Sequence, residues 1–337
     1  AFARVVEEVG YGMIGQTDQI APIDRRTYAL RSVTATVPCI PLIASSILSK
    51  KLAEGLDVLL LDVKVGDGAF ITDRAMSDAL AHTMVDLANA RGVRTVALQT
   101  AMDRPLGVAV GNGLEADEAI AALKGGGPED FRRLVVRQAA EIAALALGVA
   151  GVSAGVPLAA EVSPDTLDAA VEAWSRRAEA ALDSGAAFAR FLRNVEAQGG
   201  DRAACEAAGP LAPAPVVRDV HCDASGTVRA VEPRPLGLAV IDLGGGREKL
   251  GDEIDASVGF EVLVRPGDEV RSGQTIGRVH LADEAATGHA GDVLRRAVRL
   301  EGASDPLPLV VGRIQPGPDV SSRPEAAPAS PAADPDA

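Results

Sequence analysis

A serine and a lysine lie four residues apart in PLIASSILSKKLAEG, residues 41–55. The apolar residues of this segment recur at helical spacing and Gly55 supplies a stop, so the pattern predicts an amphipathic helix; they are Ile43, Ile47, Leu48 and Leu52. Ser46 and Lys50 then share one helix face. A hydroxyl and an ammonium group on one face could bind a small polar ligand, although a plain solvated helix face fits the same spacing.

A glycine-rich loop follows the next apolar run, DVLLLDV at 57–63. Gly66 and Gly68 lack a Cβ, so their backbone could approach a ligand closely. The loop is neither GxGxxG nor a P-loop, and alone it is a weak signal. Asp62 and Lys64 flank the end of the run and fit a structural ion pair.

The elements around this loop predict a parallel sheet. Residues 57–63 read as a buried strand, 73–91 as a helix that Gly92 ends, and 93–98 as a second strand. The expected buried stripe of the helix is Met76, Leu80, Met84 and Leu87. Strand, helix and strand in this order form a βαβ unit, which indicates an α/β fold.

The sequence changes in character after residue 210. Pro210, Pro213 and Pro215 indicate a linker, and short Val- and Ile-rich runs between glycines at 226–281 predict a small β-rich domain. Residues 315–337 are rich in Pro, Ala, Ser and Asp, which predicts a disordered tail.

Composition excludes several classes of partner. The net charge of −14 argues against binding to nucleic acid or to an anionic membrane surface. The uncharged run 142–160 is rich in Ala and Gly, and we interpret it as a helix end and loop rather than a membrane span. Cys39, Cys205 and Cys222 are too scattered for a disulfide framework or a zinc site, which favours reduced thiols in the cytoplasm.

Several long motifs, in order, resemble those of the thymidine and pyrimidine-nucleoside phosphorylase family. They are GQTDQIAPIDRRTYALRSVTATVPCIPLIASSILSKKLAEG (15–55), LDVKVGDGAF (61–70), DRPLGVAVGNGLEADEAI (103–120), LKGGGPEDF (123–131), GLAVIDLGGGRE (237–248) and VGFEVLVRPGDEVRSGQTIGRVH (258–280). The resemblance covers roughly residues 10–282.

The resemblance implies an α/β fold with a parallel or mixed sheet, part of a small α lobe and a small C-terminal α+β (β-rich) domain. We expect the central α/β lobe at 1–17 and 57–205, the α lobe at 18–54 and the C-terminal domain at 216–312. The implied reaction is attack of inorganic phosphate on the anomeric carbon of a pyrimidine nucleoside. Its products are the free base and a pentose 1-phosphate.

Carried over by motif, the residues that act on the base are Arg31 and Lys50, with Ser46 beside them. Their cations would meet negative charge that develops on the departing pyrimidine in the transition state. Tyr28, Ile43 and Phe70 match positions that the family places around the pyrimidine ring.

The resemblance also implies a site for a monovalent cation, typically potassium. Its ligands would be the Leu106 and Ala109 carbonyls and the Glu118 carboxylate, and oxygen ligands suit a hard cation. Without the resemblance, Glu118 reads as a plain helix-surface carboxylate. No cofactor is implied for the chemistry itself, and phosphate is a co-substrate.

Some family motifs are missing from these 337 residues. The Lys-His-Ser element and the SGRG signature of the phosphate site do not occur, so no phosphate-binding residue is predicted. We therefore expect an N-terminally truncated chain, with the homodimer contacts of the complete protein mostly outside it. Ser32 stands where the family usually has Asp, and Asp67 where a small or polar residue is usual.

Three alternatives stay open. The chain could be a catalytically inactive fragment that retains only the pyrimidine-binding half-site. It could be a carrier module, because VRPGDEVRSGQTIG resembles biotinyl and lipoyl turns; the nearby lysine is Lys249, which lacks the Met or Ala neighbours common at such attachment sites. A purine or AMP-type substrate is a distant runner-up, disfavoured because the set of Arg31, Ser46 and Lys50 matches pyrimidine enzymes. The sequence does not distinguish thymidine from deoxyuridine or uridine.

Overall fold

Two parallel strands form the centre of the molecule. In the computed structural model, β1 (Val58–Val65) pairs in parallel with β2 (Arg94–Ala101), and α4 (Arg74–Asn89) connects them. This confirms the predicted βαβ unit. The structure describes residues 2–15, 21–24, 27, 39–153, 164–247, 249, 252–302 and 305–317. Within these, β11 (Val310–Ile314) adds to the far side of β2 in the antiparallel direction, which makes the sheet mixed.

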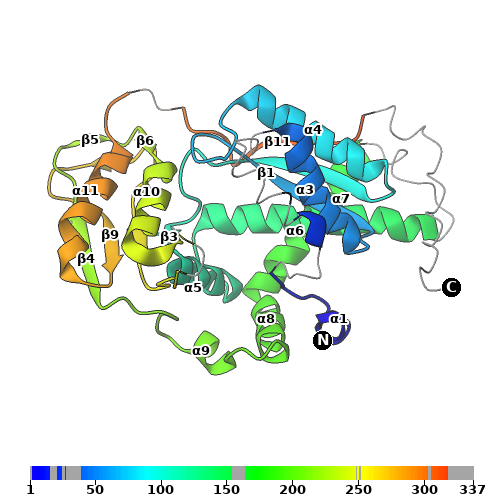
Figure 1. Cartoon of the computed structure of the whole chain (residues 1–337), viewed down its shortest axis with the longest axis horizontal. Coiled ribbons are helices and arrows are strands. Elements are labelled where there is room, and N and C mark those ends of the chain that lie inside the picture. Colours follow the sequence, from blue (N-terminus) through cyan, green and yellow to red (C-terminus); the bar gives the residue numbers. More distant parts are fainter. Residues whose placement is uncertain are drawn as a thin grey trace.

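Helices cover both faces of this sheet (Figure 1). On one face, α3 (Ile40–Ala53) packs against α4, and α4 packs against both parallel strands. On the other face lies α6 (Glu129–Ser153), which pairs with α7 (Pro164–Asp183). Asp73 caps α4 by accepting a hydrogen bond from the Met76 N–H at 2.7 Å.

The buried stripe of α4 differs from the predicted one. Leu80 and Met84 are buried as expected, but Met76 and Leu87 are 38% and 47% exposed. The small residues Ala81 and Ala88 are buried instead, which lets the helix backbone approach the strands closely. They pack in one cluster with α3 and the odd-numbered residues of β1, together with Ala44, Leu48, Leu59, Leu61 and Val63.

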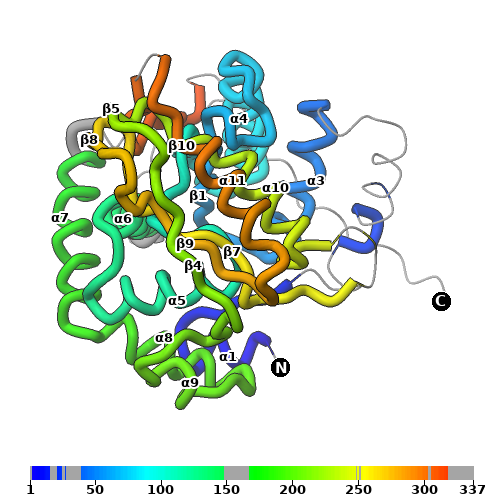
Figure 2. The backbone as a smooth tube through the Cα atoms, turned by 90° about the vertical axis from the view of Figure 1, so that its left-hand side faces the viewer, coloured from blue at the N-terminus to red at the C-terminus, as the bar shows by residue number. Residues whose placement is uncertain are grey.

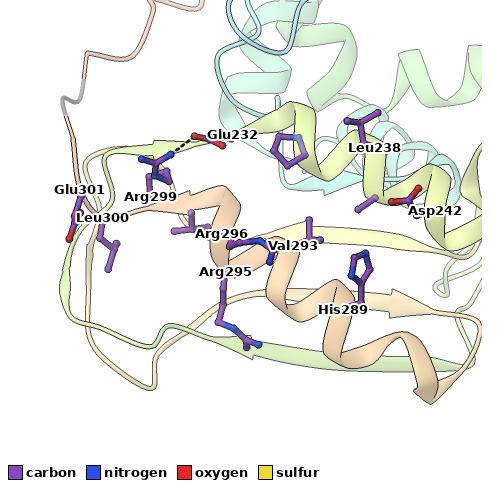
Figure 3. A pocket seen from close by; sticks show the side chains of 13 residues that line it. Glu232, Leu238, Asp242, His289, Val293, Arg295, Arg296, Arg299, Leu300 and Glu301 are labelled. Carbon is purple, nitrogen blue, oxygen red and sulfur yellow. Dashed lines mark hydrogen bonds and ion pairs between the residues drawn. The ribbon is translucent and has the colours of Figure 1, made fainter.

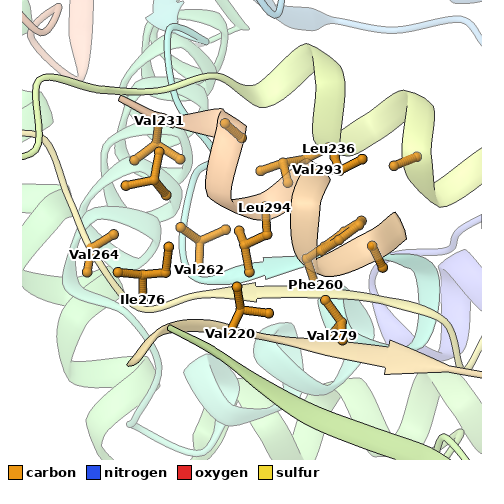
Figure 4. Packing of buried hydrophobic residues seen from close by; sticks show 14 of the residues in the cluster. Val220, Val231, Leu236, Phe260, Val262, Val264, Ile276, Val279, Val293 and Leu294 are labelled. Atoms are coloured by element: carbon orange, nitrogen blue, oxygen red, sulfur yellow. The ribbon is translucent and has the colours of Figure 1, made fainter. Parts of the chain in front are cut away.

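The C-terminal domain surrounds a second core (Figures 1 and 4). A sheet of order β3-β7-β9-β4 carries α10 (Pro233–Val240) and α11 (Thr287–Ala297) on one face. Phe260, Leu236 and Leu294 are fully buried between sheet and helices. The strands are β3 (Ala109–Val110), β4 (Val216–His221), β7 (Gly259–Val262) and β9 (Thr275–Leu281).

The remaining elements complete the path of the chain. Figure 2 shows α1 beside α8, with α9 next to them at one end of the molecule. The bounds are α1 Phe2–Val9, α5 Asn112–Leu123, α8 Ala186–Ala197, α9 Arg202–Glu206, β5 Gly226–Thr227, β6 Ala230–Val231, η2 Ile241–Gly245, β8 Glu269–Val270, η3 Glu284–Ala286 and β10 Val298–Arg299.

Two sequence predictions fall partly outside the described residues. The uncharged run 142–160 continues α6 as far as Ser153, and residues 154–163 are not described. In the described part of the chain, no helix has the length and apolar character that a membrane crossing requires. Of the tail, only 315–317 are described, where the Gly317 N–H donates to Asp86 Oδ1 at 3.3 Å.

A buried ion-pair network fixes β11. The Glu141 side chain of α6 is fully buried and lies 2.9 Å from Arg313 Nη2 of β11 and 2.7 Å from Arg137 Nη2. The Arg313 side chain is itself only 13% exposed. The Glu141 carboxylate therefore neutralises the Arg313 guanidinium, which is brought into the interior when β11 pairs with β2.

Replacing this carboxylate should destabilise the fold. Glu141→Gln leaves the sheltered Arg313 with only the exposed Asp168, 3.4 Å away, as counter-charge, and we expect a loss of about 3 kcal/mol in the free energy of unfolding. Urea denaturation measures this loss. Glu172→Gln removes an exposed pair with Arg176 and should change stability by only a few tenths of a kcal/mol. Equal effects of the two substitutions would contradict the role given to Glu141.

A second charged cluster makes the C-terminal sheet sensitive to acid. The Glu261 carboxylate lies 3.2 Å from His280 Nε2 and 3.2 Å from Arg278 Nη1, and Arg278 also contacts Asp219. The hydrogen bond from His280 and the contact with Arg278 outweigh burial and lower the pKa of Glu261 below its ordinary value of 4.5.

A lowered pKa in the folded state means that the ionised carboxylate stabilises the fold above pH 4.5. This contribution disappears as the pH falls through the lower folded-state value. We expect Glu261→Gln to lower the Tm at pH 7, and the gap to the parent protein to close as the pH falls toward 3. Thermal melts across this range measure the gap, with the exposed Glu206→Gln as control. A gap that stays constant would show that Glu261 does not titrate in this way.

Candidate functional site

Helix α3 brings Ser46 and Lys50 together on one face, as the spacing predicts. Lys50 Nζ donates to Ser46 Oγ at 3.2 Å, and Ser46 is buried while Lys50 is 25% exposed. Lys50 lies in the last turn, where the negative end of the helix dipole favours a cation. The pair therefore combines a buried hydroxyl with an ammonium group that still reaches solvent.

Asp24 joins this pair and was missed by the sequence analysis. Its Oδ2 lies 2.7 Å from Lys50 Nζ, and its side chain is only 9% exposed. An ion pair this sheltered is screened much less than one on the surface. The two residues are 26 positions apart, so no helical or strand period links them. The position of Asp24 directly before the basic residues Arg25 and Arg26 offered no local signal.

The other predicted base-site residues fall into two groups. Tyr28 and Arg31, together with Ser32, lie outside the described residues. Ile43 is half-buried and packs against the α3–α4 core, while Phe70 is 70% exposed. Among the described residues, no hydrogen bond or ring contact links Phe70 to Ser46 and Lys50. The assignment of these residues to a base site stays a prediction.

The glycines of the 66–68 loop are required by the chain itself. A Cβ on Gly66, at φ +127°, would lie 2.6 Å from the Asp103 nitrogen, and one on Gly68 would meet Met102 and Pro233. The Gly68 N–H donates to the Met102 carbonyl at 2.8 Å. The predicted ion pair is also present, with Lys64 Nζ 2.7 Å from Asp62 Oδ2. The loop thus packs directly against Met102 and Asp103, the first residues after β2.

Glu118 of α5 lies against that segment. Its Oε1 accepts hydrogen bonds from the Val108 N–H at 2.7 Å and the Ala109 N–H at 3.1 Å. Burial raises the pKa of Glu118 above its ordinary value, against the opposing effect of these two hydrogen bonds, and the nearby Asp130 raises it further. A carboxylate in this position is more than a helix-surface charge, because its negative charge is partly buried and only partly balanced.

The peptide groups beside Glu118 are fixed at most of their polar ends. The Gly107 N–H donates to Asp130 Oδ2 at 3.3 Å, the Gly107 carbonyl accepts from Arg265 Nη2, and the Val108 carbonyl accepts from the Val262 N–H at 2.8 Å. Hydrogen-bonded pairs alternate along an antiparallel ladder. Since Val108 uses its carbonyl on β7, the Ala109 carbonyl points away from β7, on the side where its N–H meets Glu118.

The predicted ligands of a monovalent cation are therefore the oxygen atoms around residues 106–109 that accept no hydrogen bond in the described part of the chain. In the described part of the chain, the Leu106 and Ala109 carbonyls and Glu118 Oε2 have no hydrogen-bond donor. All three are oxygens, the donor type that suits a hard cation. A positive charge there would also offset the partly buried carboxylate of Glu118. The residues present thus fit the group that the resemblance implies.

A groove elsewhere contains none of the predicted site residues. It lies in the C-terminal domain between α10 and α11 and has a volume of about 780 Å³. Figure 3 shows His289, Arg296 and Asp242 at its rim, with Arg299 paired to Glu232 at 2.8 Å. Both arginines and carboxylates line the groove, so its charge does not favour one class of ligand.

Gly107 should tolerate no side chain. Its φ is +69°, and a Cβ would collide with the Glu118 carboxylate. Gly55 has nearly the same φ, +68°, with no atom within 4 Å of such a Cβ. Gly55→Ala should cost about 1 kcal/mol of backbone strain. Gly107→Ala should cost about 2 kcal/mol more because the carboxylate must move. Chemical denaturation compares the two, and equal losses would contradict this packing.

Comparison with known families supports the motif-based resemblance. Residues 1–188 match the family described as "Glycosyl transferase family, a/b domain", and residues 227–301 match "Pyrimidine nucleoside phosphorylase C-terminal domain". The two matches cover the βαβ unit with its helices and most of the C-terminal core.

Curated relatives extend over nearly the whole chain. The thymidine phosphorylases of Burkholderia orbicola and Burkholderia cenocepacia are 42% identical over 316 residues, which is 93% of this chain and 68% of theirs. The thymidine phosphorylase of Rhizobium meliloti is 40% identical over 321 residues, again 68% of its length. The chain is a pentosyltransferase and belongs to the thymidine and pyrimidine-nucleoside phosphorylase family.

Proposed function

We propose that the protein cleaves the N-glycosidic bond of pyrimidine nucleosides with inorganic phosphate, in pyrimidine salvage or catabolism. A phosphate oxygen forms a bond to the anomeric carbon while the bond from that carbon to the base nitrogen breaks. The electron pair of the broken bond moves onto the pyrimidine, which leaves as the free base after it gains a proton. The other product is ribose or deoxyribose 1-phosphate.

The observation that carries this proposal is the cluster of Ser46 and Lys50 on α3 with Asp24 against them. A departing pyrimidine gains negative charge on its carbonyl oxygens and ring nitrogen, and the Lys50 ammonium would stabilise that charge where it develops. Asp24 holds the ammonium at 2.7 Å, which limits the positions that Lys50 Nζ can take. The Ser46 hydroxyl can donate to or accept from the ring edge.

Arg31 would supply the second cation of this site, with Tyr28, Ile43 and Phe70 around the ring. This part of the proposal rests on the resemblance and on the position of Ile43 on α3, one turn before Ser46. Arginine suits the role because its planar fork can donate to two acceptors of the base at once.

We further propose that a monovalent cation, potassium in the family pattern, is held by the Leu106 and Ala109 carbonyls and Glu118. When bound, the cation would supply a fixed positive charge that neutralises the partly buried Glu118 carboxylate and rigidifies the segment between Leu106 and Ala109. The free acceptors described above support this proposal.

The remaining parts of the proposal concern partners and location. The net charge of −14 supports small-molecule substrates rather than nucleic acid as ligands. Three free cysteines, two of them buried, support a reducing cytoplasmic location. Assembly as a homodimer is proposed from the resemblance alone.

A pair of neighbouring lysines gives a matched test of the function. We expect release of free base from thymidine, deoxyuridine or uridine only when phosphate is present, as measured by chromatography of the products. Lys50→Met should lower kcat/KM by about 10²-fold, the loss typical of one charged transition-state contact. Lys51→Met is the control, because Lys51 pairs with Glu54 on the exposed side of α3.

Base release without phosphate, or no base release from a protein that also carries the family's phosphate-site motifs, would overturn phosphorolysis. Calorimetric titration with thymine then separates the remaining cases. Binding that Lys50→Met weakens, without any turnover, would mean that the protein binds pyrimidines but does not cleave nucleosides. The comparisons do not favour that alternative.

A further inference from the structure

We infer that Arg265 of the C-terminal domain is a positioning residue for the monovalent-cation site, so that this domain sets the affinity of the site. The inference rests on the cation site of the proposed function. It concerns a residue that binds neither the cation nor the substrate and acts through the backbone between Leu106 and Ala109.

Arg265 reaches the segment from a rigid turn. Residues Arg265–Asp268 form a turn in which the Asp268 N–H donates to the Arg265 carbonyl at 3.0 Å, with Pro266 second and Gly267 third at φ +102°. This is the sequence preference of a type II turn. The Asp268 carboxylate also accepts from the Arg265 N–H at 2.7 Å. The start of the Arg265 side chain is therefore fixed.

The guanidinium holds one peptide group from its oxygen end. Arg265 Nη2 donates to the Gly107 carbonyl, while the N–H of the same peptide, on Val108, donates to Glu118 Oε1. The peptide is thus clamped between the C-terminal domain and α5. Because a peptide group is planar, fixing both ends sets its tilt. The preceding peptide, which carries the Leu106 carbonyl, adjoins the clamped one directly. The following peptide is held by the Val262 N–H and by Glu118, and the Ala109 carbonyl comes directly after it.

Asp130 completes the clamp. Its Oδ2 accepts from the Gly107 N–H at 3.3 Å and lies 3.7 Å from Arg265 Nη2. The N–H and carbonyl of Gly107 are therefore held by two groups that also attract each other. The Leu106 carbonyl belongs to the same peptide as the Gly107 N–H and points away from Asp130, since the two ends of a trans peptide are opposed.

The positive charge of Arg265 is the minor influence. Asp130 Oδ2 lies 3.7 Å from Arg265 Nη2, so a carboxylate partly offsets the charge of the guanidinium where it meets the segment. Removing Arg265 therefore costs the site its shape more than it relieves repulsion of a bound cation. Loss of the site's shape would weaken potassium binding, whereas relief of repulsion would strengthen it. The direction of the change in affinity therefore tests the inference.

The test measures potassium binding without using catalysis. Thermal unfolding of the full chain is followed against KCl concentration, with N-methylglucamine chloride keeping the ionic strength constant. A ligand that binds the folded state raises the Tm, and the midpoint reports its affinity. We expect Arg265→Gln to raise the half-saturating potassium concentration about tenfold, the effect of losing one hydrogen bond from a charged donor.

Two further variants separate geometry from charge. Arg265→Lys keeps the charge but loses the fork, and it should fall between the parent protein and Arg265→Gln. Arg271→Gln, an exposed arginine of the same domain, should leave the midpoint unchanged.

An unchanged or tighter midpoint in Arg265→Gln would overturn the positioning role. If the parent protein itself shows no specific effect of potassium, the cation site of the proposed function fails, and this inference fails with it. Neither result would decide whether the protein carries out phosphorolysis, because the Lys50 variants test that proposal.

Discussion

The complete burial of β2 is the constraint on which the other features depend. All eight of its residues are buried, because β1 and β11 occupy its two edges and helices cover both faces of the sheet. A strand in this position cannot shift its register without moving every neighbour. Its carboxyl end therefore offers a fixed starting point for the segment that carries Gly107, which continues as a strand of the C-terminal sheet.

Both candidate sites use a sheltered carboxylate to hold another group in place. Asp24 fixes the ammonium of Lys50, and Glu118 fixes two backbone N–H groups while one of its oxygens stays available. In each case the carboxylate gives up solvation and is partly compensated by the group that it orients. Pre-organised charge of this kind costs no rearrangement at the moment a ligand binds, which is why it suits catalysis and ion binding.

Local sequence patterns were sufficient for the βαβ unit, for α3 and for the shared face of Ser46 and Lys50, because these depend on short apolar runs and on the helical period of 3.6 residues. They failed where contacts are distant in the chain. β11 joins β2 from some 210 residues away, and Asp24 meets Lys50 across 26 positions. The buried face of α4 differs from the predicted one because the prediction ranked residues by hydrophobicity alone. Close packing of the helix on the strands instead buries the small residues Ala81 and Ala88 and leaves Met76 and Leu87 exposed. The contact between Arg265 and Gly107 had no local signal at all.

The return of the chain to β2 has a consequence for the order of folding. Residues 216–302 form their own core, yet they lie between β2 and the strand that covers its second edge. During synthesis from the N-terminus, the C-terminal domain can bury its apolar residues before the central sheet gains β11. Until then one edge of β2 exposes unpaired backbone groups, a template for pairing with other chains. Pairing of the short strand Val310–Ile314 thus closes the exposed edge of β2. A mispaired strand would leave the sheltered Arg313 away from Glu141, which makes mispairing costly.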